Sequence, residues 1–283
     1  MEENIYSKIT NPEFYKNGLE PYPVVQSLEE WLETDISRVK NRGTRWLSEY
    51  FFPRNEVRAT KINNNIFYSP VDGVVMFAKD KVNATENIIE VKGCNYTLQD
   101  LFEDPDLKGD FLVVSIFLTF YNQHQTFAPY SGMRTYEELS SLTTYNKPML
   151  AVEKDILNGV INPAAQEDYL KKNARQIDTY YNSKLQNEFY VISIADLDVD
   201  CIVNYHQKDG MISTSTLQGK RVSYITYGSQ AFLVIPLYSG GVKYKVRKEC
   251  KVGNVVKAKI SPIVDVCWDE FYEQGEVEDV EEI

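Results

Sequence analysis

The spacing of hydrophobic residues changes from helical near the N-terminus to strand-like after residue 60. Residues 24–41 and 42–50 carry the spacing of two helices, and Ser27 with Glu30 three positions later is typical of a helix start. From Ile66 on, β-branched and aromatic runs alternate with Gly, Asn, Asp and Pro, which predicts short strands joined by turns. The clearest expected strands are 111–121, 189–194, 198–204, 222–226, 231–235, 242–247 and 255–260. Short helices are expected at 98–107, 136–142 and 166–173.

This pattern predicts three parts. Residues 1–60 form an N-terminal helical lead-in, residues 61–265 form the main domain, and residues 266–283 form an acidic C-terminal tail. The expected fold class is α+β, with a β-rich body and an N-terminal helical layer.

Composition limits the partners of the protein. The 283 residues carry a formal net charge of −11, which argues against nucleic acid and anionic membranes. No apolar run reaches the roughly 18 residues of a membrane-spanning helix, and the N-terminus lacks the pattern of a signal peptide. We therefore expect a cytoplasmic protein with weak or no membrane association. The cysteines are scattered without a Cys-x-x-Cys pair, which predicts reduced thiols and no metal site: Cys94, Cys201, Cys250 and Cys267.

The dipeptide Gly228-Ser229, just before the apolar run 231–236, is the strongest candidate for chemistry. Glycine allows a backbone turn tight enough for the serine hydroxyl to face the carbonyl carbon behind it. That geometry permits an N→O acyl shift, and β-elimination of the resulting ester then converts the serine into a pyruvoyl group. Alone, Gly-Ser before a strand is usually a simple turn, so the neighbouring motifs decide its meaning.

Seven motifs occur in a fixed order. They are 50–54 (YFFPR), 68–75 (YSPVDGVV), 91–102, 117–119 (FLT), 128–132 (APYSG), 173–175 (NAR) and 228–229 (GS). This ordered set resembles the phosphatidylserine decarboxylase family, which includes soluble aromatic amino-acid decarboxylases. The resemblance extends from about Trp46 to Pro236 and more loosely to Pro262. It implies that residues 61–265 form a phosphatidylserine-decarboxylase-like catalytic domain that uses a self-derived pyruvoyl group and no metal.

The resemblance also implies roles for individual residues. Ser229 would become the pyruvoyl group, with Gly228 on the other side of the cleaved bond. Asp72 would be the carboxylate that orients and charges the histidine of the self-cleavage triad. His124 would act as an acid-base group near the substrate.

The sequence departs from the family pattern Tyr-His-Arg-x-His-x-Pro-x-x-Gly. Aligned without a gap, His124 takes the first histidine position, Gln125 replaces the arginine, and Phe127 replaces the histidine that serves as base in self-cleavage. A gapped alignment places His124 in the second position but needs two extra residues before Pro129. We take the ungapped alignment because it alone keeps the spacing of residues 117–119. Further departures are Gln230 for threonine, and Asp200 in a position where the family has glycine.

Three further groups of charged or titratable residues are explained without a role in catalysis. Asp196, Asp198 and Asp200 alternate along an expected strand, which suggests solvent exposure, with a cation site as the weaker alternative. Lys243, Lys245 and Arg247 alternate along residues 242–247 and read as a solvated strand face. His206 is expected to be a surface residue in a turn.

Three functions compete. The first is pyruvoyl-dependent decarboxylation of phosphatidylserine or a small amino acid, and the net charge favours the free amino acid. The alternative is a processing-defective homologue with a binding or scaffolding role, which Phe127, Gln125 and Asp200 suggest. Direct hydrolysis by the serine is disfavoured because no Gly-x-Ser-x-Gly sequence surrounds it.

Overall fold

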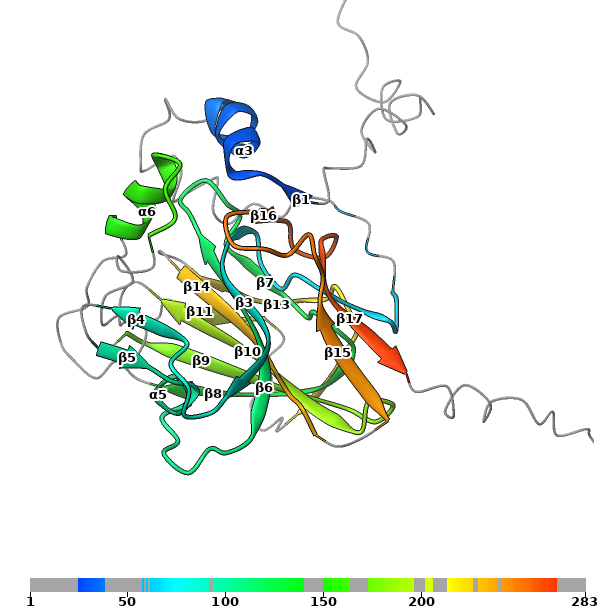
Figure 1. Ribbon diagram of the computed structural model, residues 1–283. Coiled ribbons are helices and arrows are strands. Elements are labelled where there is room, and N and C mark those ends of the chain that lie inside the picture. The colour runs from blue at the N-terminus through cyan, green and yellow to red at the C-terminus, as the bar shows by residue number, and fades with distance from the viewer. Residues whose placement is uncertain are drawn as a thin grey trace, which may run out of the picture.

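A nine-stranded antiparallel sheet forms the centre of the protein (Figure 1). The structure is a computed structural model that describes residues 25–38, 58, 60, 62–91, 94–139, 150–162, 173–195, 202–205, 213–225, 229–238 and 241–268. The strands of the central sheet, in spatial order, are β1 (Val25–Gln26), β16 (Val255–Val256), β3 (Gly73–Asn83), β6 (Asp110–Leu118), β14 (Ser229–Pro236), β10 (Asn187–Ala195), β9 (Arg175–Asn182), β8 (Gly132–Leu139) and β12 (Thr214–Thr216).

Smaller elements surround this sheet. The other sheets are β11 (Ile202–Asn204), β13 (Arg221–Ile225) and β7 (Gln125–Phe127); β15 (Val242–Val246), β17 (Pro262–Trp268) and β2 (Ile66–Tyr68); and the pair β4 (Ile89–Val91) and β5 (Cys94–Tyr96). The described helices are α3 (Leu28–Thr34), the 3₁₀ helix η1 (Ile36–Arg38), α5 (Leu98–Phe102) and α6 (Leu150–Leu157).

Both faces of the central sheet are buried. Along β6, Val113 and Phe117 pack in one core with Trp31 of α3 and Ile156 of α6. The alternate residues of β6, including Leu112 and Ile116, pack in a second core. Their partners there come from the two three-stranded sheets and include Phe67, Val222 and Val264. Burial on both sides explains why the sequence of β6 is a nearly continuous apolar run and not an alternating one.

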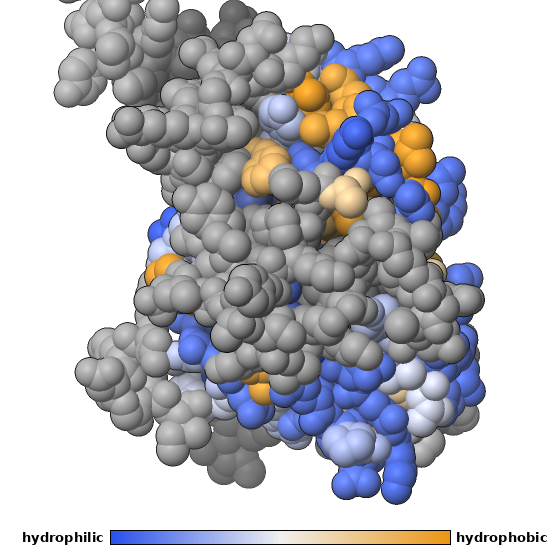
Figure 2. Space-filling view, turned by 90° about the vertical axis from the view of Figure 1, so that its left-hand side faces the viewer, coloured by the Kyte–Doolittle hydropathy of each residue, from blue (hydrophilic) through white to orange (hydrophobic). Residues whose placement is uncertain are grey.

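Helices from separate parts of the chain cover the first of these faces. Trp31 and Ile156 belong to the same core, and a Cβ placed on Gly159 would lie 4.0 Å from the side chain of Leu32. Figure 2 shows hydrophobic residues gathered at the height where Figure 1 places α3 and α6. The predicted N-terminal helical layer is not shown: the described N-terminal residues form the short helices α3 and η1, and residues 42–50 lie outside the described part. The predicted Ser27 cap is confirmed, since its Oγ accepts the N–H of Glu30.

Most of the predicted strands that can be checked are confirmed, with two corrections. Residues 136–142 were expected to be helical, but 132–139 form β8, which pairs along its length with β9. Tertiary pairing here overrides the helix propensity of Glu137 and Glu138. The expected strand 255–260 is only the two-residue β16, because the following residues turn back towards β17. The predicted helix at 98–107 is confirmed as the shorter α5, which a capping box of Thr97 and Asp100 begins.

The structure makes Gly73, the first residue of β3, sensitive to substitution. A Cβ there would lie 2.2 Å from the carbonyl oxygen of Phe117 on β6. We expect Gly73→Ala to lower the free energy of unfolding by at least about 3 kcal/mol, since the rigid backbone of β6 must move. Urea denaturation measures this, with Gly109→Ala as control, because Gly109 has a φ of +106° but open space around it. Gly109→Ala introduces backbone strain without a clash, at a cost of about 1–2 kcal/mol. An equal loss in the free energy of unfolding for both variants would contradict the steric argument.

Candidate active site

The candidate residues meet at one end of the central sheet, where β3 and β14 begin and β6 ends. Val74 of β3 pairs with Phe117 of β6, and Ser229 of β14 pairs with Leu118 of β6. Asp72 directly precedes β3, so the backbones of Asp72 and Ser229 lie on either side of β6, about 10 Å apart at the usual strand spacing. Two residues that are distant in sequence are thereby brought to the same site.

Asp72 is fully buried and receives hydrogen bonds from three parts of the chain. Arg58 binds both of its carboxylate oxygens, with Nη1–Oδ1 and Nη2–Oδ2 distances of 2.5 and 2.7 Å. Gln123 Nε2 donates to Oδ1 at 3.2 Å, and the N–H of Ala258 donates to Oδ1 at 2.8 Å. None of these donors is a histidine. The predicted role of Asp72 in charging a histidine stays a prediction, because the link to His124 runs through its neighbour Gln123.

These contacts keep Asp72 ionised. Burial alone would raise the pKa of its carboxyl group, but the charge and hydrogen bonds of Arg58, with Lys257 and the Ala258 N–H, lower that pKa to about 2. Arg58 is equally buried, with its side chain 1% exposed, so each charge neutralises the other. Burial makes each charge dependent on its partner.

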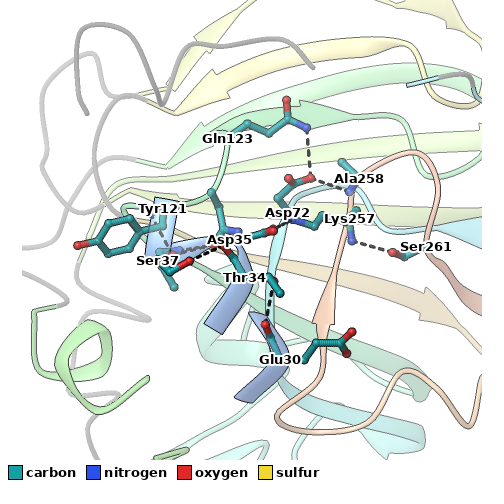
Figure 3. Close-up of polar contacts among 12 residues, drawn as sticks. Glu30, Thr34, Asp35, Ser37, Asp72, Tyr121, Gln123, Lys257, Ala258 and Ser261 are labelled. Atoms are coloured by element: carbon teal, nitrogen blue, oxygen red, sulfur yellow. Dashed lines mark hydrogen bonds and ion pairs between the residues drawn. The ribbon is translucent and has the colours of Figure 1, made fainter. Parts of the chain in front are cut away.

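The turn between β16 and β17 closes one side of the site (Figure 3). Ser261 fixes this turn, since its Oγ accepts the N–H of Lys257 and its own N–H donates back to the Lys257 carbonyl. The Lys257 ammonium group binds Asp35, next to α3, with an Nζ–Oδ2 distance of 2.6 Å. The N-terminal segment is thus attached to the turn that supplies the Ala258 N–H to Asp72.

His124 is fully buried between the end of β6 and the start of β7. Its Nε2 lies 3.0 Å from the carbonyl oxygen of Thr119, which follows Leu118, the partner of Ser229. A carbonyl accepts only, so Nε2 carries a proton and Nδ1 is the basic nitrogen of the neutral ring. The His124 carbonyl accepts the N–H of Ile225, the last residue of β13, and only residues 226–228 separate Ile225 from Ser229 in sequence. The backbone contacts therefore place His124 beside Ile225 and beside the β6 residue that pairs with Ser229.

Phe127 is buried on β7, and its N–H donates to the carbonyl oxygen of Pro70, two residues before Asp72. Its ring faces the ammonium group of Lys259, which lies 5.1 Å from the ring centre. Gly228 and the side chain of Ser229 lie outside the described residues. Whether the Phe127 ring points at the serine hydroxyl, as the ungapped alignment predicts, therefore stays a prediction.

The Asn-Ala-Arg motif at residues 173–175 supports the strand next to Ser229. Asn173 Nδ2 donates to the carbonyl oxygen of Ala195, and the Ala195 N–H donates to Ala174; Ala195 is the β10 partner of Ser229. Arg175 extends the other way, donating to the Asp100 carbonyl and pairing with Glu103. This motif thus positions Ser229 and fastens α5 to the central sheet.

A second buried cluster, which the sequence analysis missed, lies between β9 and the β11–β13–β7 sheet. Asp178 Oδ1 accepts from Arg134 at 2.6 Å and from Gln176 at 2.9 Å, and Asn204 binds both Arg134 and Gln176. Burial raises the pKa of Asp178 to about 6 despite the opposing charge of Arg134. The cluster draws on three separate segments, around residues 134, 176–178 and 204, so the local sequence around Asp178 did not indicate it.

Several other predicted features can be placed. Lys243 and Lys245 are exposed on β15, which confirms the solvated basic face. Cys250 and Cys267 are free thiols, and burial raises the pKa of Cys250 to about 12. Within the described ranges, no helix is long and apolar enough to span a bilayer. Several residues lie outside the description, as backbone or as side chain: Cys94, Asp196, Asp198, Asp200, Cys201 and His206.

The fold and site define a β-rich protein in which a serine preceded by glycine begins a central strand, next to a buried histidine and a buried ion-paired aspartate. A family model described as phosphatidylserine decarboxylase matches residues 49–258, more than half of the 283 residues. The chain therefore belongs to the phosphatidylserine decarboxylase family, and the resemblance found in its motifs is confirmed. Members of this family are pyruvoyl-dependent decarboxylases whose implied substrate is phosphatidylserine. The comparison with curated proteins found no match.

The Arg58–Asp72 pair predicts an unusual dependence of stability on pH. In the wild type, the folded-state pKa of Asp72 is about 2, below its ordinary 3.8, so the pair stabilises the fold above about pH 4 and this stabilisation is lost as the pH falls towards 2. In Arg58→Gln, burial instead raises the pKa of Asp72, so stability should fall as the pH rises. We expect a loss of about 3–5 kcal/mol at pH 7 in urea denaturation.

The double variant Arg58→Gln/Asp72→Asn is the matched control, because it removes both charges. It should be more stable than Arg58→Gln at pH 7 and equal to it at the acidic end of the range. A single variant at least as stable as the double variant at pH 7 would rule out an unpaired buried charge as the cause.

Proposed function

We propose that this protein is a pyruvoyl-dependent decarboxylase whose prosthetic group derives from Ser229. The observation that carries the proposal is the position of Ser229 as the first residue of β14, between β6 and β10 and next to the His124 segment. Membership of the phosphatidylserine decarboxylase family supports the same reaction class.

The strand pairing suits a chain that cleaves itself before Ser229. In that reaction the serine Oγ attacks the Gly228 carbonyl carbon and the peptide C–N bond breaks to give an ester. Elimination then releases residue 228 as a carboxylate, and the dehydroalanine left at 229 takes up water and loses ammonia. β14 pairs with β6 and β10 from Ser229 onward, so the new end would stay in place after the cut.

Once formed, the pyruvoyl carbonyl supplies an electron sink for the electrons left behind when CO₂ departs. The protein's own contribution is positioning and proton transfer. His124 is the proposed acid-base group, and its Nε2–H···Thr119 bond holds the ring in one tautomer with Nδ1 as the basic atom. Burial of His124 excludes water from the proton that it carries.

The substrate of this proposal is an amine that bears a carboxylate on the adjacent carbon, either phosphatidylserine or a free amino acid. The net charge of −11 weakens attraction to anionic bilayers and favours a water-soluble encounter, so a cytoplasmic location is part of the same proposal.

A second candidate function is binding without processing. The hydrogen bonds of Asp72 all go to Arg58, Gln123 and Ala258, and Phe127 occupies a position where the family uses a base. A chain with this arrangement that stays uncut would act as a binding or scaffolding protein. The intact mass of the purified protein separates the two functions.

We expect Ser229→Ala to abolish cleavage. The wild-type chain should give two polypeptides, 1–228 and 229–283, whereas Ser229→Ala should give one species of 32.7 kDa in intact-mass measurements. The C-terminal wild-type fragment should also resist N-terminal sequencing, because a pyruvoyl group has no amine. A wild-type chain that stays at 32.7 kDa would reject the decarboxylase in favour of the unprocessed binding protein.

Position 127 should control the rate of this cleavage. Phe127→His restores a base where the ungapped alignment expects one, so the fragments should accumulate faster on a denaturing gel. Phe127→Leu keeps the position apolar and controls for altered packing. Equal cleavage rates in both folded variants would exclude position 127 as the place of the base.

A further inference from the structure

Two cations lie together beside Phe127, outside the Asp72 network. Arg221, the first residue of β13, is the strand partner of Phe127 on β7, so the two side chains share one face. The ammonium group of Lys259 lies 5.1 Å from the centre of the Phe127 ring. The Arg221 guanidinium stacks on Tyr205 at 4.3 Å from the ring centre, and Tyr205 in turn donates to Gln125 of β7. We call these two residues the Arg221–Lys259 pair.

This pair lacks the carboxylate partners that neighbouring cations have. Arg58 binds Asp72, Lys257 binds Asp35 and Arg247 binds Asp265, but no carboxylate forms an ion pair with Arg221 or Lys259 among the described residues. Burial, Arg58 and Arg221 together lower the pKa of Lys259. Carboxylates outnumber cations in this chain, 41 to 30, so a shortage of carboxylates does not explain why these two cations have no such partner among the described residues.

The backbone holds Lys259 in place. Its φ is +73°, in the left-handed region that non-glycine residues rarely adopt. Its N–H donates to the carbonyl oxygen of Ser69 at 3.1 Å, and Ser261 closes the turn around it. The surrounding hydrogen bonds hold this strained backbone conformation, and it directs the Lys259 side chain to the Phe127 face.

The pair suits a phosphate ester better than a carboxylate. A guanidinium fork and an ammonium group both donate to phosphate oxygens. The carboxylate of the substrate loses its charge as CO₂ leaves, so two cations upon it would stabilise the reactant more than the transition state. A phosphodiester keeps its charge throughout, so cations there strengthen binding without opposing the reaction.

On these grounds, and resting on the proposed function, we infer that Arg221 and Lys259 bind the phosphate of a serine phosphodiester whose amine reacts at position 229. Phe127 is the last residue of β7 and His124 directly precedes that strand, so the two are three residues apart, about 10 Å along an extended chain. The two ends of the substrate would therefore occupy the two ends of β7. The net charge of the chain favours a free amino acid, whereas this local pair selects a headgroup that carries phosphate.

The test is calorimetric titration of the full-length Ser229→Ala chain with glycerophosphoserine, free serine and inorganic phosphate. Glycerophosphoserine is water-soluble, so the result does not depend on membrane binding. We expect it to bind more tightly than either other probe. Arg221→Gln/Lys259→Met should raise its Kd at least tenfold and leave that of serine unchanged, and higher salt should weaken the binding.

Two further variants control this experiment. Lys251→Met removes one charge from an exposed residue and should change nothing, whereas Lys259→Arg keeps the charge and should retain binding. Unchanged glycerophosphoserine binding in the double variant would overturn the inference. Inorganic phosphate binding as tightly as glycerophosphoserine would also overturn it, because the site would then be one for free phosphate.

The outcome is separable from that of the proposed function. In the cleaved wild-type background, the double variant should raise KM for glycerophosphoserine with kcat unchanged. A wild-type chain that is never cleaved, but whose Ser229→Ala form loses binding in the double variant, rejects the decarboxylase and keeps the phosphate site. A wild-type chain that is cleaved and active, together with unchanged glycerophosphoserine binding in the double variant, supports the decarboxylase and rejects the phosphate site.

Discussion

The buried charge of Asp72 joins four separate parts of the chain. Arg58 comes from before β2, Asp72 itself precedes β3, Gln123 lies between β6 and β7, and Ala258 lies between β16 and β17. A buried carboxylate that loses its partner costs several kcal/mol, so these segments are held together at the end of the sheet. The position of the first residues of β3 depends on this arrangement. Because β3 and β14 both pair with the end of β6, the position of Ser229 relative to Asp72 depends on it as well.

Two buried aspartates show how nearby charges and hydrogen bonds together decide the pKa of a carboxyl group. Asp72 and Asp178 are both fully buried and both face an arginine. Asp72 has both oxygens bound by Arg58 and a backbone N–H in addition, and its pKa is lowered to about 2. Asp178 receives its donors on Oδ1 while Oδ2 has no hydrogen-bond partner in the described ranges, and burial raises its pKa to about 6. The charges of Arg58 and Lys257 and the hydrogen bonds together overcome the effect of burial on Asp72, whereas the charge of Arg134 and the hydrogen bonds to Asp178 do not.

Charge acts on this protein at two ranges. The net charge of −11 governs long-range attraction to membranes and nucleic acid, and salt screens it over about 8–10 Å. Arg221 and Lys259 lie together on the Phe127 face, and the phosphate site proposed for them would act at contact distance. The total charge therefore predicts how the protein meets large charged surfaces, but it does not predict the chemistry of one small site.

The sequence by itself determined the β-rich body, the helix start at Ser27, the short helix after residue 97, the buried strand β6 and the order of motifs that marks the family. These features depend on residues close in sequence, where spacing and capping act directly. It could not determine that residues 132–139 pair as a strand, that Arg58 neutralises Asp72, or that Arg221 meets Lys259. Those outcomes depend on contacts between residues far apart in sequence, from 14 positions for Arg58 and Asp72 to 48 (181 − 133) for Met133 and Tyr181, which only the fold brings together. The tertiary structure decided them because a buried charge or a strand edge takes its partner from whichever segment the fold places beside it.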